Sequence, residues 1–209
     1  MENKKSSMGM DALKLFLITL IAGLLLGLVY QITKDPIAES NLKAKNEAYQ
    51  KVFPDAAEFS ENPDITSAVS DTAAIEKLLS ENELGGTVIS EVMEAKDASG
   101  TVIGYVASFT AKEGYGGDIS LSMGVAADGT ITGLEVLSAS ETAGLGANCT
   151  TDAFKSQFAG INSERVEYTK MGRSADNEID ALSGATITTK AVTKAVNSLL
   201  LFLHTSVMK

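Results

Sequence analysis

The side chains best suited to chemistry in this sequence are hydroxyls that crowd into a short stretch near the C-terminus. Residues 180–192, DALSGATITTKAV, contain four of them: Ser183, Thr186, Thr188 and Thr189. A helical pattern begins here, and helix capping by Ser183 or Thr186 would explain one hydroxyl but not all four. A small Gly-Ala turn that leads into a helix also presents free backbone N–H groups, which suit a phosphate. Lys190 would add positive charge nearby.

Other chemistries find little support in the residue types. A serine nucleophile would need a base, but LSGAT lacks the G-x-S-x-G elbow and His204 is the only histidine. Cys149 is the only cysteine, so the chain has neither an internal disulfide nor a His/Cys cluster with zinc-ligand spacing. We therefore expect no hydrolase and no metal centre.

Two glycine-rich loops could approach a ligand closely. Residues 112–118 read KEGYGGD and residues 141–148 read ETAGLGAN, and each follows a β-rich run. Ordinary turn chemistry explains either loop alone. Neither is a dinucleotide fingerprint, because the strand-GxGxxG-helix context is missing, and the chain contains no GxxxxGK[ST] motif.

The elements that must position these loops follow from the hydrophobic pattern. Four β-rich runs separated by turn signals predict an antiparallel meander: 86–97, 101–112, 118–128 and 130–140. Helical patterns are expected before and after it: 38–53, 71–79 with an Asp cap, a short helix within 150–160, and an amphipathic helix at 189–203. Residues 166–171 and 177–182 look like a hairpin around GRSAD. The expected class is α+β.

The N-terminal segment predicts a membrane anchor. Residues 15–33 carry no charge, and as a helix they would reach about 28 Å, close to the thickness of a bilayer's hydrocarbon core. The run is longer than that of a cleaved signal peptide and no A-x-A-like site follows it, so we expect it to be retained. Lysines flank the span on both sides, so the charge count does not choose an orientation.

The charge of the chain excludes one class of partner. Its 209 residues carry a net charge of −10, and the four lysines of residues 1–34 leave the rest more acidic still. Nucleic acids are bound through clusters of Lys and Arg, which this sequence lacks. We expect an anchored, acidic domain that does not bind nucleic acid.

Three motifs in order resemble those of the FMN-binding domain family found in the G subunit of the Rnf complex and the C subunit of the sodium-pumping quinone reductase. They are GYGG at 114–117, ETAGLG at 141–146 and DALSGATIT at 180–188. In this family the FMN phosphate is esterified to the last Thr of S-G-A-T-x-T, which falls on Thr188. The resemblance assigns the phosphate surroundings to Ser183, Gly184, Ala185 and Thr186. It assigns the ring pocket to Glu141, Thr142, Gly144, Leu145 and Gly146, and its rim to Gly114, Tyr115, Gly116 and Gly117.

The resemblance extends over almost the whole chain and carries functional expectations. The segments ITKDPIAESNLKAKNEAY and VFPDA, together with Ala143 where the quinone-reductase relative usually has Pro, look more like the Rnf protein. The implied function is electron relay by covalent FMN in a membrane complex that couples electron transfer between ferredoxin and NAD to ion translocation. This function would need no side chain for acid-base catalysis. Implied partners are the other membrane, iron-sulfur and flavin subunits, and a flavin transferase that uses FAD.

The expected organisation is a cytoplasmic N-terminus at 1–14, a transmembrane helix at 15–33, a helical connecting region at 34–85 and an FMN-binding domain at 86–209. By resemblance, the domain lies outside the cytoplasm, attached to the cell membrane by its single span. Two alternatives remain open at this point. One is an anchored flavoprotein of the same fold, either free-standing or in a sodium-pumping quinone reductase, and the other is a non-redox anchored module whose SGAT loop holds an unrelated anion.

Overall fold

The structure is a computed structural model that describes residues 8–208, without the side chains of residues 8, 35–42 and 44. Two compact units make up the chain, Met1–Asn46 and Glu47–Lys209. The expected cytoplasmic segment at 1–14 therefore lies partly outside the described residues.

Helix α1, Met8–Val52, contains the predicted span. Among the described residues one stretch, Gly9–Lys34, is long and apolar enough to cross a membrane, with a mean hydropathy of 2.5 and no buried side chains. The helix expected at 38–53 is not separate, because α1 runs on without a break to Val52. It ends just before Pro54, which disfavours the helical conformation of the residue preceding it.

The second unit is built on a five-stranded antiparallel sheet in the order β1-β2-β3-β4-β5. The strands are β1 Glu58–Ser60, β2 Thr87–Lys96, β3 Val102–Ala111, β4 Ile119–Ala126 and β5 Ile131–Ala139. The four strands β2 to β5 coincide with the four predicted runs, and their pairing confirms the antiparallel meander and the α+β class. The edge strand β1 is too short to be read from its pattern of hydrophobic residues.

Two short helices precede the meander. Helix α3, Thr72–Glu81, is the predicted second helix, and the Asp71 side chain accepts from the N–H of Ala74 as its cap. Helix α2, Pro63–Ser70, was not predicted, although Asn62 at its N-cap and Pro63 in its first turn are typical start signals. Both helices contribute buried side chains to the same core as the sheet.

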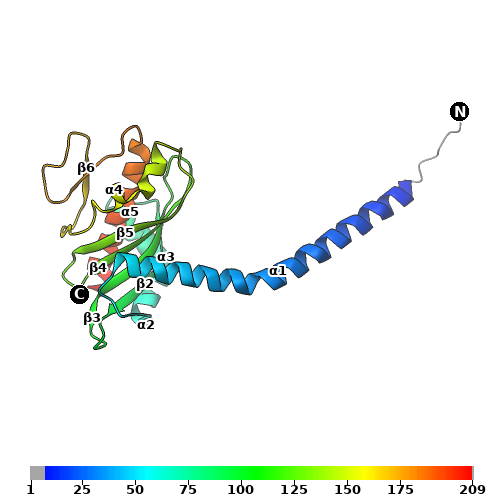
Figure 1. Cartoon of the computed structure of the whole chain (residues 1–209), viewed down its shortest axis with the longest axis horizontal. Coiled ribbons are helices and arrows are strands. Elements are labelled where there is room, and N and C mark those ends of the chain that lie inside the picture. The colour runs from blue at the N-terminus through cyan, green and yellow to red at the C-terminus, as the bar shows by residue number, and fades with distance from the viewer. Residues whose placement is uncertain (1–7, 209) are drawn as a thin grey trace. The chain divides into compact units, whose positions relative to one another are not determined.

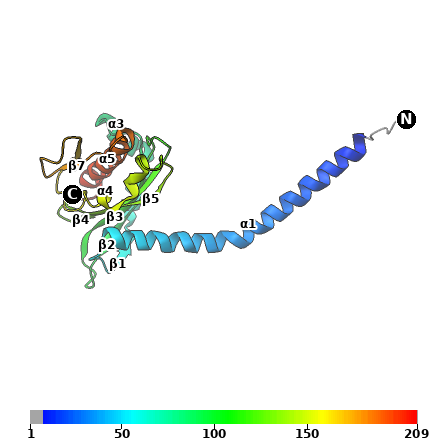
Figure 2. The same ribbon diagram turned by 45° about the horizontal axis from the view of Figure 1, so that its top comes forward.

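Helix α5, Thr186–Phe202, lies against one face of the sheet, as Figures 1 and 2 show, and it supplies the largest share of the core. Its contacts with β2 and β3 bury side chains from both layers. The buried residues of α5 are mostly apolar or hydroxyl-bearing: Thr188, Thr189, Ala191, Val192, Thr193, Ala195, Val196, Asn197, Ser198, Leu199, Leu200 and Phe202. A π-helical turn, Leu203–Val207, continues it.

The other face of the sheet is covered by the end of α1, residues 47–52, which belong to the second unit. Tyr49, Val52 and Phe53 form a second buried cluster together with Ala95 and Val106 of the sheet. The approach is close enough that a Cβ on Gly124 would collide with the carbonyl oxygen of Val52. The sheet is therefore packed on both faces, which fixes the loops at its ends.

The segment between β5 and α5 is mostly irregular. It contains a 3-10 turn, Gly146–Thr150, the short helix α4, Asp152–Lys155, and two strands, β6 Glu167–Thr169 and β7 Glu178–Asp180. The predicted hairpin of these two strands is wrong, because β6 and β7 pair in parallel. Parallel pairing requires the connecting loop to return to the starting edge. The Glu178 carboxylate organises this return by accepting hydrogen bonds from the backbone of Ser174 and Ala175.

Candidate cofactor-binding site

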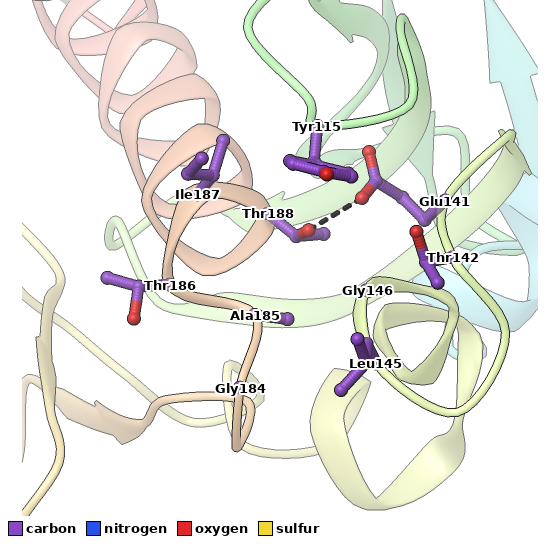
Figure 3. A pocket seen from close by; sticks show the side chains of 10 residues that line it. All are labelled: Tyr115, Glu141, Thr142, Leu145, Gly146, Gly184, Ala185, Thr186, Ile187 and Thr188. Carbon is purple, nitrogen blue, oxygen red and sulfur yellow. Dashed lines mark hydrogen bonds between the residues drawn. The ribbon is translucent and has the colours of Figure 1, made fainter.

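A cavity of about 380 Å³ lies where two loops at one end of the sheet meet the start of α5 (Figure 3). The sheet register explains why the loops meet. Ile119 at the start of β4 pairs with Ala111 at the end of β3 and with Ala139 at the end of β5. Ten residues line the cavity: Tyr115, Glu141, Thr142, Leu145, Gly146, Gly184, Ala185, Thr186, Ile187 and Thr188.

The loop before α5 is held by one hydroxyl of the opening motif. Thr189 Oγ1 accepts from the N–H of Leu182 at 3.0 Å and donates to the carbonyl of Ala185 at 3.0 Å. The side chain is fully buried, so these bonds are shielded from water. Thr189 therefore fixes the turn that brings Gly184 and Ala185 to the cavity.

The expected helix caps are wrong. Residue Ala185 occupies the N-cap position of α5 with no side-chain hydrogen bond, and Thr186 is already the first helical residue. Ser183 is exposed and does not line the cavity. A buried Thr189 that ties down the loop from within the helix makes a side-chain cap unnecessary, because the turn is already fixed.

The missing cap leaves a row of free donors. The backbone N–H groups of Thr186, Ile187 and Thr188 donate no hydrogen bond to an acceptor among the described residues. These belong to the first turn of a helix of 17 residues, where orphan N–H groups and the positive end of the dipole favour an anion. None of the ten lining residues carries a positive charge. Lys190 does not line this cavity and instead lines a separate hollow together with Arg165.

At the base of the cavity the Thr188 hydroxyl donates to a carboxylate. Its Oγ1 lies 2.7 Å from Glu141 Oε2, and the side chain is 1% exposed (Figure 3). The other carboxylate oxygen of Glu141, Oε1, accepts from the N–H of Gly116 at 3.0 Å. Glu141 therefore links the two sheet-end loops to the first turn of α5.

Gly146 is required for this arrangement. A Cβ at this position would collide with the Glu141 carboxylate and lie 2.5 Å from Thr188 Oγ1. Just beyond it, Cys149 is fully buried, and burial, reinforced by the negative charge of Glu141, raises the pKa of its thiol to about 11. The thiol is therefore neutral at physiological pH and plays no part as a nucleophile.

The mouth of the cavity is apolar and open. Tyr115, Leu145 and Ile187 are 68%, 43% and 53% exposed although each has a large apolar side chain. They come from three different segments of the chain and surround the same opening. Large exposed apolar side chains around a cavity are typical of a binding site for a flat, partly apolar ligand.

The structure brings most of the sequence-predicted site residues together. Of those expected, Thr188, Gly184, Ala185, Thr186, Glu141, Thr142, Leu145, Gly146 and Tyr115 line the cavity. The others do not line it: Ser183, Gly144, Gly114, Gly116 and Gly117. Gly116 acts through its backbone, by its hydrogen bond to Glu141. Ile187 was missed, although its place as the variable residue of S-G-A-T-x-T puts it in the same helical turn.

Comparison with known families agrees with this geometry. Residues 114–201 match the model of the FMN-binding domain, and residues 1–52 match that of the RnfG N-terminal region. The chain is 34% identical over 187 residues to the G subunit of the Na⁺-translocating ferredoxin:NAD⁺ oxidoreductase complex of Acetobacterium woodii, covering 88% of this chain and 85% of that one. The chain belongs to the RnfG family of ion-translocating oxidoreductase complexes.

Two further comparisons extend this result. The G subunit of the proton-translocating ferredoxin:NAD⁺ oxidoreductase complex of Clostridium ljungdahlii is 31% identical and aligns over 84% of this chain and 80% of its own length. The crystal structure of Shewanella oneidensis NqrC aligns with 54% of this chain and 59% of its own at 26% identity, with a TM-score of 0.46, a likeness too partial to add to the assignment. This member of the RnfG family thus belongs to a multi-subunit membrane complex and has an FMN-binding domain, and the described residues contain one apolar helix suited to anchoring it.

Proposed function

We propose that this member of the RnfG family carries FMN covalently on Thr188 and relays electrons within its complex. The observation that carries the proposal is the position of the Thr188 hydroxyl. It lies at the base of the cavity and beside the three free N–H groups of the first turn of α5, within the segment that matches an FMN-binding domain. A phosphate esterified to this oxygen would be within reach of those donors.

The other three hydroxyls are less suited to attachment. Thr189 is fully buried and engaged in holding the loop, and Ser183 does not line the cavity. Thr186 lines the cavity, but its side chain points away from Glu141 and Thr188 in Figure 3. Geometry therefore favours Thr188, as the resemblance to the family does.

The rest of the cavity suits the ring of the cofactor. Tyr115, Leu145 and Ile187 present apolar surface that would cover an isoalloxazine ring, while their own exposure leaves the ring edge close to the surface. FMN supplies the redox chemistry when bound, and the protein positions it and sets its surroundings. A ring edge near the surface is what a relay needs, because electrons must pass to and from a partner protein.

A covalent bond has a physical purpose in this setting. We infer that the domain lies outside the cytoplasm, where a cofactor held only by weak interactions would be lost to dilution. A phosphoester keeps the cofactor at full occupancy without altering its ring. The bond would be made by a flavin transferase that uses FAD. Membership of the RnfG family supports this function over that of a non-redox module.

Purification from the native membrane tests this function. We expect the protein to co-purify with other membrane and iron-sulfur or flavin subunits, to carry flavin after denaturation, and to be reduced by electrons supplied through the complex. The relay would be contradicted if the protein co-purifies with these partners and carries flavin, but this flavin is not reduced when electrons are supplied to the complex. A colourless protein in an intact complex would contradict the flavoprotein assignment.

A further inference from the structure

The carboxylate of Glu141, which accepts a hydrogen bond from Thr188, has no evident role in binding the cofactor. Glu141 is the only carboxylate among the ten residues that line the cavity, and it lies in hydrogen-bond contact with the oxygen that would carry the phosphate. An anionic side chain beside a phosphate site weakens binding by charge repulsion. Glu141 joins the Gly116 loop to Thr188, and its negative charge calls for a role besides this one.

We propose that Glu141 is the general base for the attachment of FMN to Thr188, so that the acceptor protein supplies a catalytic residue for its own modification. The inference rests on the proposed function. In the step, Thr188 Oγ1 forms a bond to the flavin-side phosphorus of FAD, and the bond from that phosphorus to the bridging oxygen breaks. AMP leaves with the electron pair on that oxygen, and the proton of Thr188 Oγ1 passes to Glu141 Oε2. No oxidation or reduction is involved.

The geometry meets the requirements of a base. The heavy-atom distance of 2.7 Å between Thr188 Oγ1 and Glu141 Oε2 is within the range for direct proton transfer. The bond from Gly116 N–H to Oε1 holds the carboxylate in place, so that it faces the hydroxyl. The absence of a side chain at Gly146 leaves space for the Glu141 carboxylate and the Thr188 hydroxyl, because a Cβ at this position would overlap both groups.

The burial of Thr188 is a further reason for a base within the chain. Thr188 is 1% exposed and its hydroxyl donates to Glu141, so the proton already faces a base of the chain when a transferase brings FAD into the cavity.

The rate of attachment tests the proposal. The flavin-free full chain in detergent is mixed with purified flavin transferase and FAD, and flavin on Thr188 is followed by gel fluorescence and peptide mass. Glu141→Gln removes the base, and we expect the rate to fall about 100-fold, within the usual range for general-base catalysis. Glu141→Asp keeps a carboxylate on a shorter stem, and its rate should lie between those of Glu141→Gln and the wild type.

The control is a carboxylate on the neighbouring loop. Glu113 pairs with Lys194 at 2.9 Å and does not line the cavity, so Glu113→Gln makes the same change in charge nearby and should keep the wild-type rate. The buried thiol of Cys149 reports on local structure, because it is fully buried and close enough to feel the charge of Glu141. In Glu141→Gln, Cys149 should stay as resistant to a thiol reagent as in the wild type.

Three results would overturn the inference while leaving the proposed function intact. They are a wild-type rate in Glu141→Gln, a slow rate accompanied by a reactive Cys149, and a Glu141→Asp variant no faster than Glu141→Gln. The second would show that Glu141 only maintains the structure, and the third would contradict the expected benefit of a retained carboxylate. Failure of the proposed function looks different, since the wild-type chain itself would then gain no flavin, or gain it on another residue.

Discussion

Thr188 and Thr189 are neighbours in the sequence, but their hydroxyls form hydrogen bonds in different parts of the structure. Thr188 Oγ1 donates to Glu141 in the cavity, while Thr189 Oγ1 bridges Leu182 and Ala185 inside the protein. The motif assigned attachment to Thr188, but it did not predict that Thr189 holds the loop before α5. A one-residue step along a helix turns a side chain by about 100°, which separates the cavity from the core.

Replacement of Thr189 should lower stability without moving the attachment away from Thr188. Thr189→Ala leaves the partly buried N–H of Leu182 without its acceptor, and we expect a loss of about 1–3 kcal/mol in the free energy of unfolding. Flavin should still attach to Thr188. Urea unfolding and gel fluorescence measure the two effects, with Thr189→Ser as the control that keeps the hydroxyl. Full stability with no attached flavin would contradict this division of roles.

A methyl group at Gly146 should block the site. In Gly146→Ala the new Cβ meets both the Glu141 carboxylate and Thr188 Oγ1, so we expect attachment to fall at least tenfold, which is about 1.4 kcal/mol at the barrier. The rate of flavin attachment is the measurement. Gly85→Ala is the matched control, because a Cβ there meets nothing within 4 Å. Equal rates in the two variants would show that Gly146 has no steric role.

At the scale of the elements, regular patterns were predictable and local exceptions were not. The strands β2 to β5 follow alternating sequence between clear turn signals, and Asp71 marks the start of α3 as expected. The parallel pairing of β6 and β7 depends on the course of the loop between them, which Glu178 organises through hydrogen bonds that no periodicity predicts. The prediction of a side-chain cap for α5 was wrong for a similar reason. The loop before the helix is held by the buried Thr189 instead of by a capping side chain.

The contact between α2 and the sheet predicts an acid sensitivity. Asn62 caps α2 with its Oδ1 and donates through Nδ2 to Glu94 of β2 at 2.6 Å. This bond, assisted by Lys96 and opposed by partial burial, holds the pKa of Glu94 below its ordinary value. A lowered pKa in the folded state means that Glu94 contributes stability above its unfolded pKa, near 4.5, and loses it as the pH falls through the folded value.

The variant Glu94→Gln should therefore be less sensitive to acid. We expect the free energy of unfolding to fall less between pH 6 and pH 3 than it does in the wild type, as measured by urea unfolding at each pH. Glu81→Gln, at an exposed pair with Lys77, is the control and should behave like the wild type. An unchanged pH dependence in Glu94→Gln would show that this bond contributes nothing to folding.

At the scale of the whole molecule, the sequence predicts an anchor and the order of the site loops, and the structure adds the start of the compact unit. The compact unit starts at Glu47, because Tyr49 and Val52 at the end of α1 pack into the second cluster of the sheet. An amphipathic pattern at the end of a long helix does not reveal which surface it covers. The Cα register of the meander, in contrast, follows from its turns and brings the two glycine-rich loops together.

Truncation tests this boundary. Deletion of residues 1–46 should give a soluble, acidic and folded domain, because the apolar span Gly9–Lys34 is removed and the second cluster is kept. Deletion of residues 1–53 also removes Tyr49, Val52 and Phe53, and should yield a protein that unfolds at a lower temperature or aggregates. Thermal unfolding and gel filtration distinguish the two. Equal stability would show that the end of α1 is dispensable.

The most direct test of covalent attachment is to locate the flavin on the peptide that contains all four hydroxyls. Cleavage after Arg173 and Lys190 releases residues 174–190, which include Ser183, Thr186, Thr188 and Thr189. Fragmentation of this peptide from protein made in the native membrane should place the mass of FMN on Thr188 alone, and Thr188→Ala should abolish the fluorescent band on a denaturing gel. Flavin on another hydroxyl, or covalent fluorescence that persists in Thr188→Ala, would contradict the assignment.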